Sequence, residues 1–345
     1  MEKTNKFIKN FIFFIILIGL TFYILFKDQD IDEIFRILAN VNKWYVLLAI
    51  FSVAGYVVCE ALNAKRNLIA LEEKTTLMKC IKYTLANAFF SGITPSSTGG
   101  QPMEVYYMHR DGIKISNATL IVLVQSCGFQ IATLSFALIS IFFNLKYMNA
   151  PLLVLFIIGF ILNAFILTVY LVSIFSRRIS KWAIQLFVKI LRKLKVKNIE
   201  QRIEKINNGL EAYQNSAKYI KANKKVIFKT LLTTAFQIFF YYSITYMVYC
   251  SFGFREYNIL QIIGMQAVVY TSTSGIPLPG AVGISEGNFM SLFKNIFINN
   301  TVTSAMLLSR GVSFYLLVIV SGIMVLVNML HLSKKQEFKE KHEEE

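Results

Sequence analysis

Six windows of the chain are apolar for about 20 residues or more, long enough for a helix to cross the ~30 Å hydrocarbon core of a bilayer. A backbone inside a membrane must satisfy its own hydrogen bonds, and a helix does so within a single segment. The sequence therefore predicts an all-α polytopic integral membrane protein. The predicted spans are residues 7–26, 44–63, 117–143, 151–175, 226–250 and 302–331.

The composition agrees with a membrane location and argues against several kinds of site. Hydrophobic residues make up 55% of the 345 residues and charged residues 16%, with a mean hydropathy of +0.52, which is too apolar for a soluble surface. The four cysteines, Cys59, Cys80, Cys127 and Cys250, are scattered, a pattern that predicts neither a metal site nor a disulfide framework. The phosphate-binding loop of nucleotide hydrolases is absent from the sequence. We therefore expect no cofactor, no metal and no ATP hydrolysis.

Most of the net charge of +16 falls in one segment between the predicted spans. Residues 177–225 hold 14 Lys and Arg against 3 Glu, so the positive-inside rule places this segment in the cytoplasm. We expect both chain termini to be cytoplasmic as well. The first part of the segment, residues 178–197, is amphipathic. That part is predicted either to bind the anionic inner leaflet or to act only as a topology determinant. The basic run matches no nucleic-acid-binding motif, so we expect no specific nucleic-acid binding.

Two apolar segments are interrupted by prolines and glycines. The sequence SGITPSSTGGQPMEVYYMHR occupies residues 91–110, and TSTSGIPLPGAVGISEGNFMSLF occupies residues 271–293. Too few helical residues precede either interruption to cross a bilayer, so each segment is predicted to enter, turn near the midplane and leave on the same side. Ordinary loops between short, tilted spans are the alternative.

Hairpins that enter from opposite faces indicate an inverted repeat, as in many secondary transporters. We expect four parts: a first membrane half, a basic cytoplasmic segment, a second membrane half and a charged cytoplasmic tail. The boundaries are 1–176 with a hairpin at 77–111, 177–225, 226–332 with a hairpin at 258–297, and 333–345.

The second half of each hairpin is predicted to point its helix N-terminus at the midplane, where free N–H groups attract anions. Gln101 or Ser285 is placed to cap such a helix. Glu104 and Glu286 occupy similar places in the two segments, either as functional groups or as carboxylates that favour a first helical turn. The hydroxyl donors Thr94 and Ser97 belong to the first tip.

Two further ionisable residues fall within predicted spans. Arg310 has apolar neighbours, and such a charge needs a partner, here either one of the two hairpin glutamates or a lipid phosphate. Glu60 lies beside Lys65 and Arg66, and a surface ion pair explains it at least as well as a function does.

The two interrupted segments, with Arg310 and the motif ALNAKRNLIAL, resemble the membrane region of bacterial lysylphosphatidylglycerol synthase–flippases, the multiple peptide resistance factors, and their stand-alone relatives. The resemblance covers nearly the whole chain. It implies that the site comprises specific motif positions: Gly99, Gly100, Gln101, Glu104, Pro279, Gly280, Gly283, Glu286 and Arg310.

In that family the membrane region moves aminoacylated phosphatidylglycerol between leaflets, while a separate cytoplasmic domain transfers lysine from lysyl-tRNA. The chain ends soon after its last predicted span, so the resemblance does not extend to that transferase domain. We expect a flippase-like protein in the bacterial cell membrane that handles phosphatidylglycerol, its aminoacyl form or a related anionic lipid. The alternatives are a phosphatidylglycerol lysyltransferase that acts with a partner synthase, and a non-transporting scaffold. Oligomerisation stays open.

The predicted topology is testable with single cysteines on a cysteine-free background. A cysteine at Asp111 should react with an impermeant thiol reagent from the cytoplasmic side, and one at Asn299 from the opposite side, because the two hairpins are predicted to enter from opposite faces. Labelling of intact and opened cells measures this. Reaction of both positions from the same side would contradict the inverted repeat.

Overall fold

The structure is a computed structural model in which all regular secondary structure of the described residues is helical. The predicted span 7–26, most of the amphipathic segment 178–197 and the tail 333–345 lie outside the described residues. The structure describes residues 31–176, 185, 189, 199–274, 276, 278–298 and 300–329.

Among the residues that the structure describes, five helices are long and apolar enough to cross a membrane, and they correspond to five of the six predicted spans. Their 26–30 residues exceed the length that a bilayer core requires. The protein is therefore an all-α, multi-pass membrane protein. The spans are α3 (Lys43–Ala70), α6 (Ile115–Asn144), α7 (Ala150–Phe175), α10 (Lys224–Ser251) and Val302–Met329, which contains α13 (Val302–Arg310) and a π-helical turn, η4 (Gly311–Leu316).

Three spans, α3, α7 and α10, begin one or two residues earlier than the apolar windows, each after an asparagine that caps it. Asn42, Asn149 and Asn223 each accept a hydrogen bond from a backbone N–H in the first turn of the following helix. Three shorter elements connect or flank the spans: α2 (Ile31–Asn40), a 3₁₀ turn η2 (Leu145–Tyr147) and α9 (Ile199–Ala222), whose Ala217 and Ile220 pack against α6 and α7.

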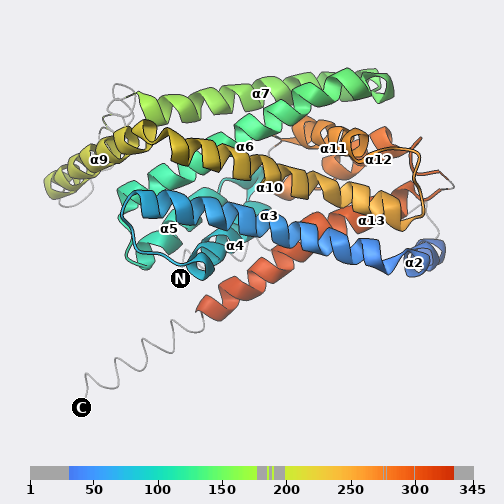
Figure 1. The fold of residues 1–345 in the computed structure, drawn as a ribbon, viewed down its shortest axis with the longest axis horizontal. Coiled ribbons are helices and arrows are strands. Elements are labelled where there is room, and N and C mark those ends of the chain that lie inside the picture. Colours follow the sequence, from blue (N-terminus) through green and yellow to red (C-terminus); the bar gives the residue numbers. More distant parts are fainter. Residues whose placement is uncertain are drawn as a thin grey trace, which may run out of the picture.

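The antiparallel packing of α3 and α10 defines the two ends of the bundle. At one end the Asn42 N–H donates to the Ser251 carbonyl (2.8 Å), and at the other Arg66 donates to the Lys229 carbonyl (2.9 Å). One helical hairpin follows the Ala70 end of α3, and the other follows the Ser251 end of α10. The two hairpins therefore enter the bundle from opposite ends (Figure 1).

Each hairpin has a helix, a 3₁₀ turn at its tip and a second helix. The first helix of each hairpin has 17 residues in one hairpin and 15 in the other, or about 25 and 22 Å at 1.5 Å per residue. Both are too short to cross a bilayer core alone. The two tips touch each other inside the bundle, an arrangement that favours re-entrant hairpins over ordinary loops. The elements are α4 (Leu77–Ile93), η1 (Pro95–Ser97) and α5 (Gly100–Arg110) in the first hairpin, and α11 (Ile259–Thr273), η3 (Pro279–Ala281) and α12 (Ile284–Phe293) in the second.

The two tips share one backbone conformation. Before the proline of each tip, Thr94 has φ −113° and ψ 144°, and Leu278 has φ −114° and ψ 142°. After the proline, Ser96 (φ 50°) and Gly280 (φ 59°) both adopt the left-handed conformation, as does the next residue in each tip. This is the local similarity that an inverted repeat requires.

The equivalent tips show that Glu104 and Glu286 do not occupy equivalent positions. Glu286 is the third residue of α12 and lies in its first turn, whereas Glu104 is the fifth residue of α5 and lies beyond it. The interpretation of Glu104 as a first-turn carboxylate was therefore wrong. The prediction placed the helix start near Pro102, whereas α5 begins two residues earlier, at Gly100.

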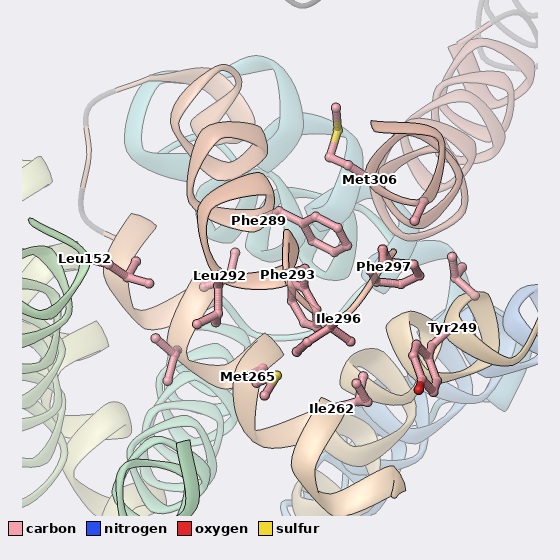
Figure 2. Close-up of a cluster of buried hydrophobic side chains, with 14 of the residues drawn as sticks. Leu152, Tyr249, Ile262, Met265, Phe289, Leu292, Phe293, Ile296, Phe297 and Met306 are labelled. Atoms are coloured by element: carbon pink, nitrogen blue, oxygen red, sulfur yellow. The ribbon is translucent and has the colours of Figure 1, made fainter. Parts of the chain in front are cut away.

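An aromatic cluster fixes the second hairpin in the bundle (Figure 2). Phe289 and Phe293 of α12 stack with ring centroids 4.4 Å apart, and Phe297 packs against both. Met306 of α13 and Tyr249 of α10 belong to the same buried cluster, as do residues of α7 and α11. Close packing of this kind holds membrane helices together where lipid is as apolar as the helix surface.

A glycine brings α7 against the second hairpin. A Cβ atom at Gly159 would lie 1.9 Å from the carbonyl oxygen of Thr271 in α11. Next to this contact, the buried Asn163 donates to the Gly159 carbonyl (2.7 Å) and to the Ser274 hydroxyl. The contact therefore fixes the position of α11 relative to α7.

Gly159→Ala is predicted to destabilise the protein by about 1–3 kcal/mol, because the added methyl group forces two backbones apart. Gly209→Ala in α9 is the matched control, since nothing lies within 4 Å of its added Cβ, and helix propensity there favours alanine. Thermal unfolding in detergent measures both. Equal unfolding temperatures for the two variants would contradict the close contact.

Candidate functional site

A cavity of about 740 Å³ lies where the two hairpin tips meet, within the size range of small-molecule sites. Its walls come from all five spans and both hairpins. The first tip connects the cavity to the surface, since Ser96, Ser97, Thr98 and Pro102 line it and are also exposed. The cavity is therefore enclosed on one side and open to the surface at the first tip.

The predicted site residues divide into a group that lines the cavity and a group that shapes it. Those lining it are Ser97, Gln101, Glu104, Gly280, Ser285 and Arg310. Those behind the lining are Thr94, Gly99, Gly100, Pro279, Gly283 and Glu286.

Arg310 is the central cation of the site, and it is bonded to the second hairpin. Its Nε donates to Glu286 Oε1 (2.9 Å), and an Nη donates to the Gly280 carbonyl (2.9 Å). Its guanidinium lies 4.4 Å from the ring centroid of Phe314. Of the partners proposed from the sequence, Arg310 thus has Glu286.

Glu286 links this arginine to the start of α12. Its Oε2 accepts from the Gly283 N–H (2.7 Å), one of the N–H groups that a helix start leaves without a partner. Gly283 has φ +91°, a conformation that suits glycine. The carboxylate is 1% exposed, so both of its oxygens are satisfied by protein groups.

Glu104 has a different environment from Glu286. Its Oε2 accepts from the Asn87 side chain (2.6 Å), while its Oε1 is buried and has no hydrogen-bond partner. The residue is 1% exposed and lines the cavity. Within the described residues the ion pairs are Lys82–Asp111 and Arg310–Glu286, so Glu104 has no cationic partner there.

A glycine makes this arrangement of Glu104 possible. A Cβ at Gly100 would lie 1.9 Å from Ser91 Oγ and 2.4 Å from Asn87 Oδ1. The close approach of α4 and α5 leaves room for a hydrogen-bond chain in which Ser91 donates to Asn87 and Asn87 donates to Glu104. The glycine pair of the first motif therefore positions a carboxylate.

The capping roles predicted for Gln101 and Ser285 were wrong. The N-caps are Gly99 and Gly283, and no side chain caps α5. Gln101 instead donates to Ser126 (2.8 Å) and to the Tyr170 hydroxyl (2.9 Å), which attaches the first hairpin to α6 and α7. The Thr94 hydroxyl accepts from the Gly99 N–H, so it satisfies the tip backbone.

Glu60 lines the cavity, and the surface ion pair predicted for it was wrong. Arg66 instead donates to Asn63, Thr233 and the Lys229 carbonyl. The Gln237 amide of α10 donates to Glu60 Oε2 (3.4 Å).

A signal for this role was present in the sequence. Tyr56, Glu60 and Asn63 recur at helical spacing on an otherwise apolar span and all line the cavity. Such a polar stripe on a membrane helix indicates a face turned toward a cavity. The partner on α10 has no comparable local signal, because Gln237 joins Glu60 only through tertiary packing.

Comparison with known proteins gives the family. A model described as the transmembrane region of lysylphosphatidylglycerol synthase matches residues 10–321, which include both hairpins. The chain belongs to this family. The resemblance inferred from the motifs is thereby confirmed.

Two relatives are similar along most of their length. A UPF0104 membrane protein of Archaeoglobus fulgidus is 23% identical over 301 residues, which cover 85% of this chain and 89% of the relative. A UPF0104 membrane protein of Pyrococcus horikoshii is 22% identical over 325 residues, 92% of this chain and 97% of that protein. The similarity therefore extends over the membrane region as a whole.

The buried ion pair predicts a non-additive effect on stability. Glu286→Gln should cost about 3–5 kcal/mol because it leaves Arg310 buried without its counter-charge. Glu286→Gln combined with Arg310→Met should restore part of this loss, since neither charge remains. Unfolding titrations of the single and double variants measure the coupling. Losses that simply add would contradict a direct pair.

Proposed function

We propose that the protein translocates a phospholipid by passing its head group through the cavity between the hairpin tips. The observation that carries this proposal is the position of the Arg310–Glu286 pair: a buried charged site where hairpins from opposite ends of the bundle meet. Irregular backbone and charge at this depth are tolerated where they line a polar cavity. Irregular backbone and charge cost free energy in lipid, so a structural role alone is a weak explanation for their presence here.

The shape of the bundle supports a lipid rather than a wholly soluble substrate. The outer surface is apolar, as shown by the exposed Phe142, Phe165 and Ile323, and suits acyl chains. The cavity, in contrast, is lined by hydroxyl, amide and charged groups. A head group inside and chains outside would match both surfaces, and the exposed Ser96–Thr98 tip offers an entry point.

The hydrogen-bond donors of the second hairpin favour an anionic group, because the guanidinium of Arg310 has five N–H groups and donates one to Glu286 and one to the Gly280 carbonyl. Arg310 and the N-terminus of α12 lie together, and helix N-termini attract phosphate. The family makes phosphatidylglycerol, its aminoacyl derivative or a related anionic lipid the first substrates to test.

Proteoliposomes with a fluorescent phosphatidylglycerol test the proposal. The protein should accelerate exchange between leaflets, and Arg310→Ala should lower the rate at least tenfold, the effect of about 1.4 kcal/mol on a barrier. Arg255→Ala is the matched control, because Arg255 is exposed and bonded to backbone carbonyls away from the cavity. Unfolding temperatures of both variants separate transport from folding.

Two other outcomes would favour different functions. A wild-type protein that leaves the exchange rate unchanged would contradict translocation and support a scaffold. Lysylated lipid formed by the pure chain from lysyl-tRNA and phosphatidylglycerol vesicles would support the transferase alternative. We expect no such product, since a general base must lie beside the attacking hydroxyl, and Glu60 and Glu104 lie within the membrane bundle, away from any tRNA.

A further inference from the structure

We propose that Glu60 and Glu104 bind a monovalent cation, a proton or Na⁺, and that its movement drives the translocation proposed above. The coupling rests on the proposed function, while the cation site rests on the geometry of the cavity alone.

The first argument is the balance of charge in the cavity. Glu60 and Glu104 both line it. Arg310, the cation of the lining, is engaged by Glu286. The buried Glu104 and the half-buried Glu60 thus lack a counter-charge among the described residues, a situation that is unfavourable unless a cation or proton neutralises them.

The second argument is the surplus of acceptor atoms. Glu104 Oε1 is buried without a hydrogen-bond partner, and so are Gln125 Oε1 and Gln130 Oε1 on α6. All three residues line the cavity, and Gln125 approaches Glu60, whose backbone carbonyl accepts from its Nε2 (3.4 Å). Unpartnered buried acceptors are rare in folded proteins. A small cation or an added proton supplies what these oxygens lack.

The third argument is that no surrounding cation forms an ion pair with either carboxylate among the described residues. Phenols and a thiol are neutral near pH 7, and the guanidinium is already paired. The titratable and charged groups around the two carboxylates are Tyr56 and Lys65 on α3, Cys80 on α4, Tyr170 on α7, Tyr241 on α10, Tyr270 on α11, Glu286 on α12 and Arg310 on α13.

The position of the carboxylates suits coupling. Glu104 lies on the first hairpin and Glu60 on α3, whereas Arg310 and Glu286 attach the second hairpin to α13. A cation on one side of the cavity and an anionic head group on the other would attract each other across it. Loading of the cation would therefore favour loading of the lipid, a reciprocal coupling between two sites.

Binding is tested first, without reference to transport. The unfolding temperature of the purified protein should rise with added Na⁺ at constant ionic strength, or on going from mildly alkaline to mildly acidic buffer. The rise should vanish in Glu60→Gln combined with Glu104→Gln. Glu256→Gln, an exposed carboxylate on the connection between α10 and α11, is the matched control and should retain it. A wild-type protein that responds to neither ion would overturn the cation site.

Coupling is tested in proteoliposomes that carry either a Na⁺ gradient or a pH gradient. The gradient of the bound ion should raise the rate of lipid exchange several-fold over the rate in symmetric buffer. In the variant that combines Glu60→Gln and Glu104→Gln, the rates with and without the gradient should be equal. The arm that responds identifies the ion. Exchange that occurs but ignores both gradients would overturn coupling and leave the proposed function intact. An absence of all exchange would instead remove the proposed function, with the stability measurement still deciding the cation site.

Discussion

The need to satisfy backbone hydrogen bonds at the centre of the bundle governs this structure. Each hairpin breaks its helix where lipid offers no partners, so the exposed backbone groups must be covered by protein. At the first tip the Thr94 hydroxyl accepts from Gly99 N–H, and at the second Glu286 accepts from Gly283 N–H while Arg310 donates to the Gly280 carbonyl. Each broken helix therefore requires specific polar side chains, of which Arg310 lines the cavity while Thr94 and Glu286 lie behind its lining.

The same requirement makes the two halves of the site unequal. In the second hairpin a carboxylate covers the helix start and an arginine from α13 neutralises it. In the first hairpin a hydroxyl covers the tip, and the carboxylate is placed beyond the first turn, next to Asn87 and facing the cavity. Similar tip backbones thus carry different charges, a closed ion pair on one side and unneutralised acceptors on the other.

This inequality matters for a translocation mechanism. A cavity with one kind of charge throughout would hold a ligand of the opposite sign too tightly to release it. A cavity with an anion-attracting side at α12 and a cation-attracting side at α3 and α5 favours joint occupancy of two weakly held groups. The first hairpin contacts the tip of the second through both η1 and α4. Both hairpins are attached to α6 and α7, the first through Gln101 and the second through α11, and Arg310 of α13 is bonded to the second.

The apolar windows alone determined the class of protein and five described spans, because the length of a helix that crosses a bilayer is set by the bilayer. The interrupted motifs, with their prolines and glycines, were also sufficient to locate two hairpins and most of the residues at their tips. Those signals are local, and each depends on residues within one segment of the chain.

Tertiary structure decided which side chains meet. The choice of Glu286 over Glu104 as the partner of Arg310 depends on how α13 packs against the second hairpin, which no spacing in the sequence encodes. Gln101 bonds to α6 and α7 instead of capping its own helix because those spans present Ser126 and Tyr170 beside it. Glu60 faces the cavity and not a nearby lysine because α10 packs against that side of α3. Arg66 donates instead to a carbonyl and a hydroxyl group of α10. The partners of buried polar atoms are set by long-range packing. Local sequence patterns could therefore identify these residues but could not assign their roles.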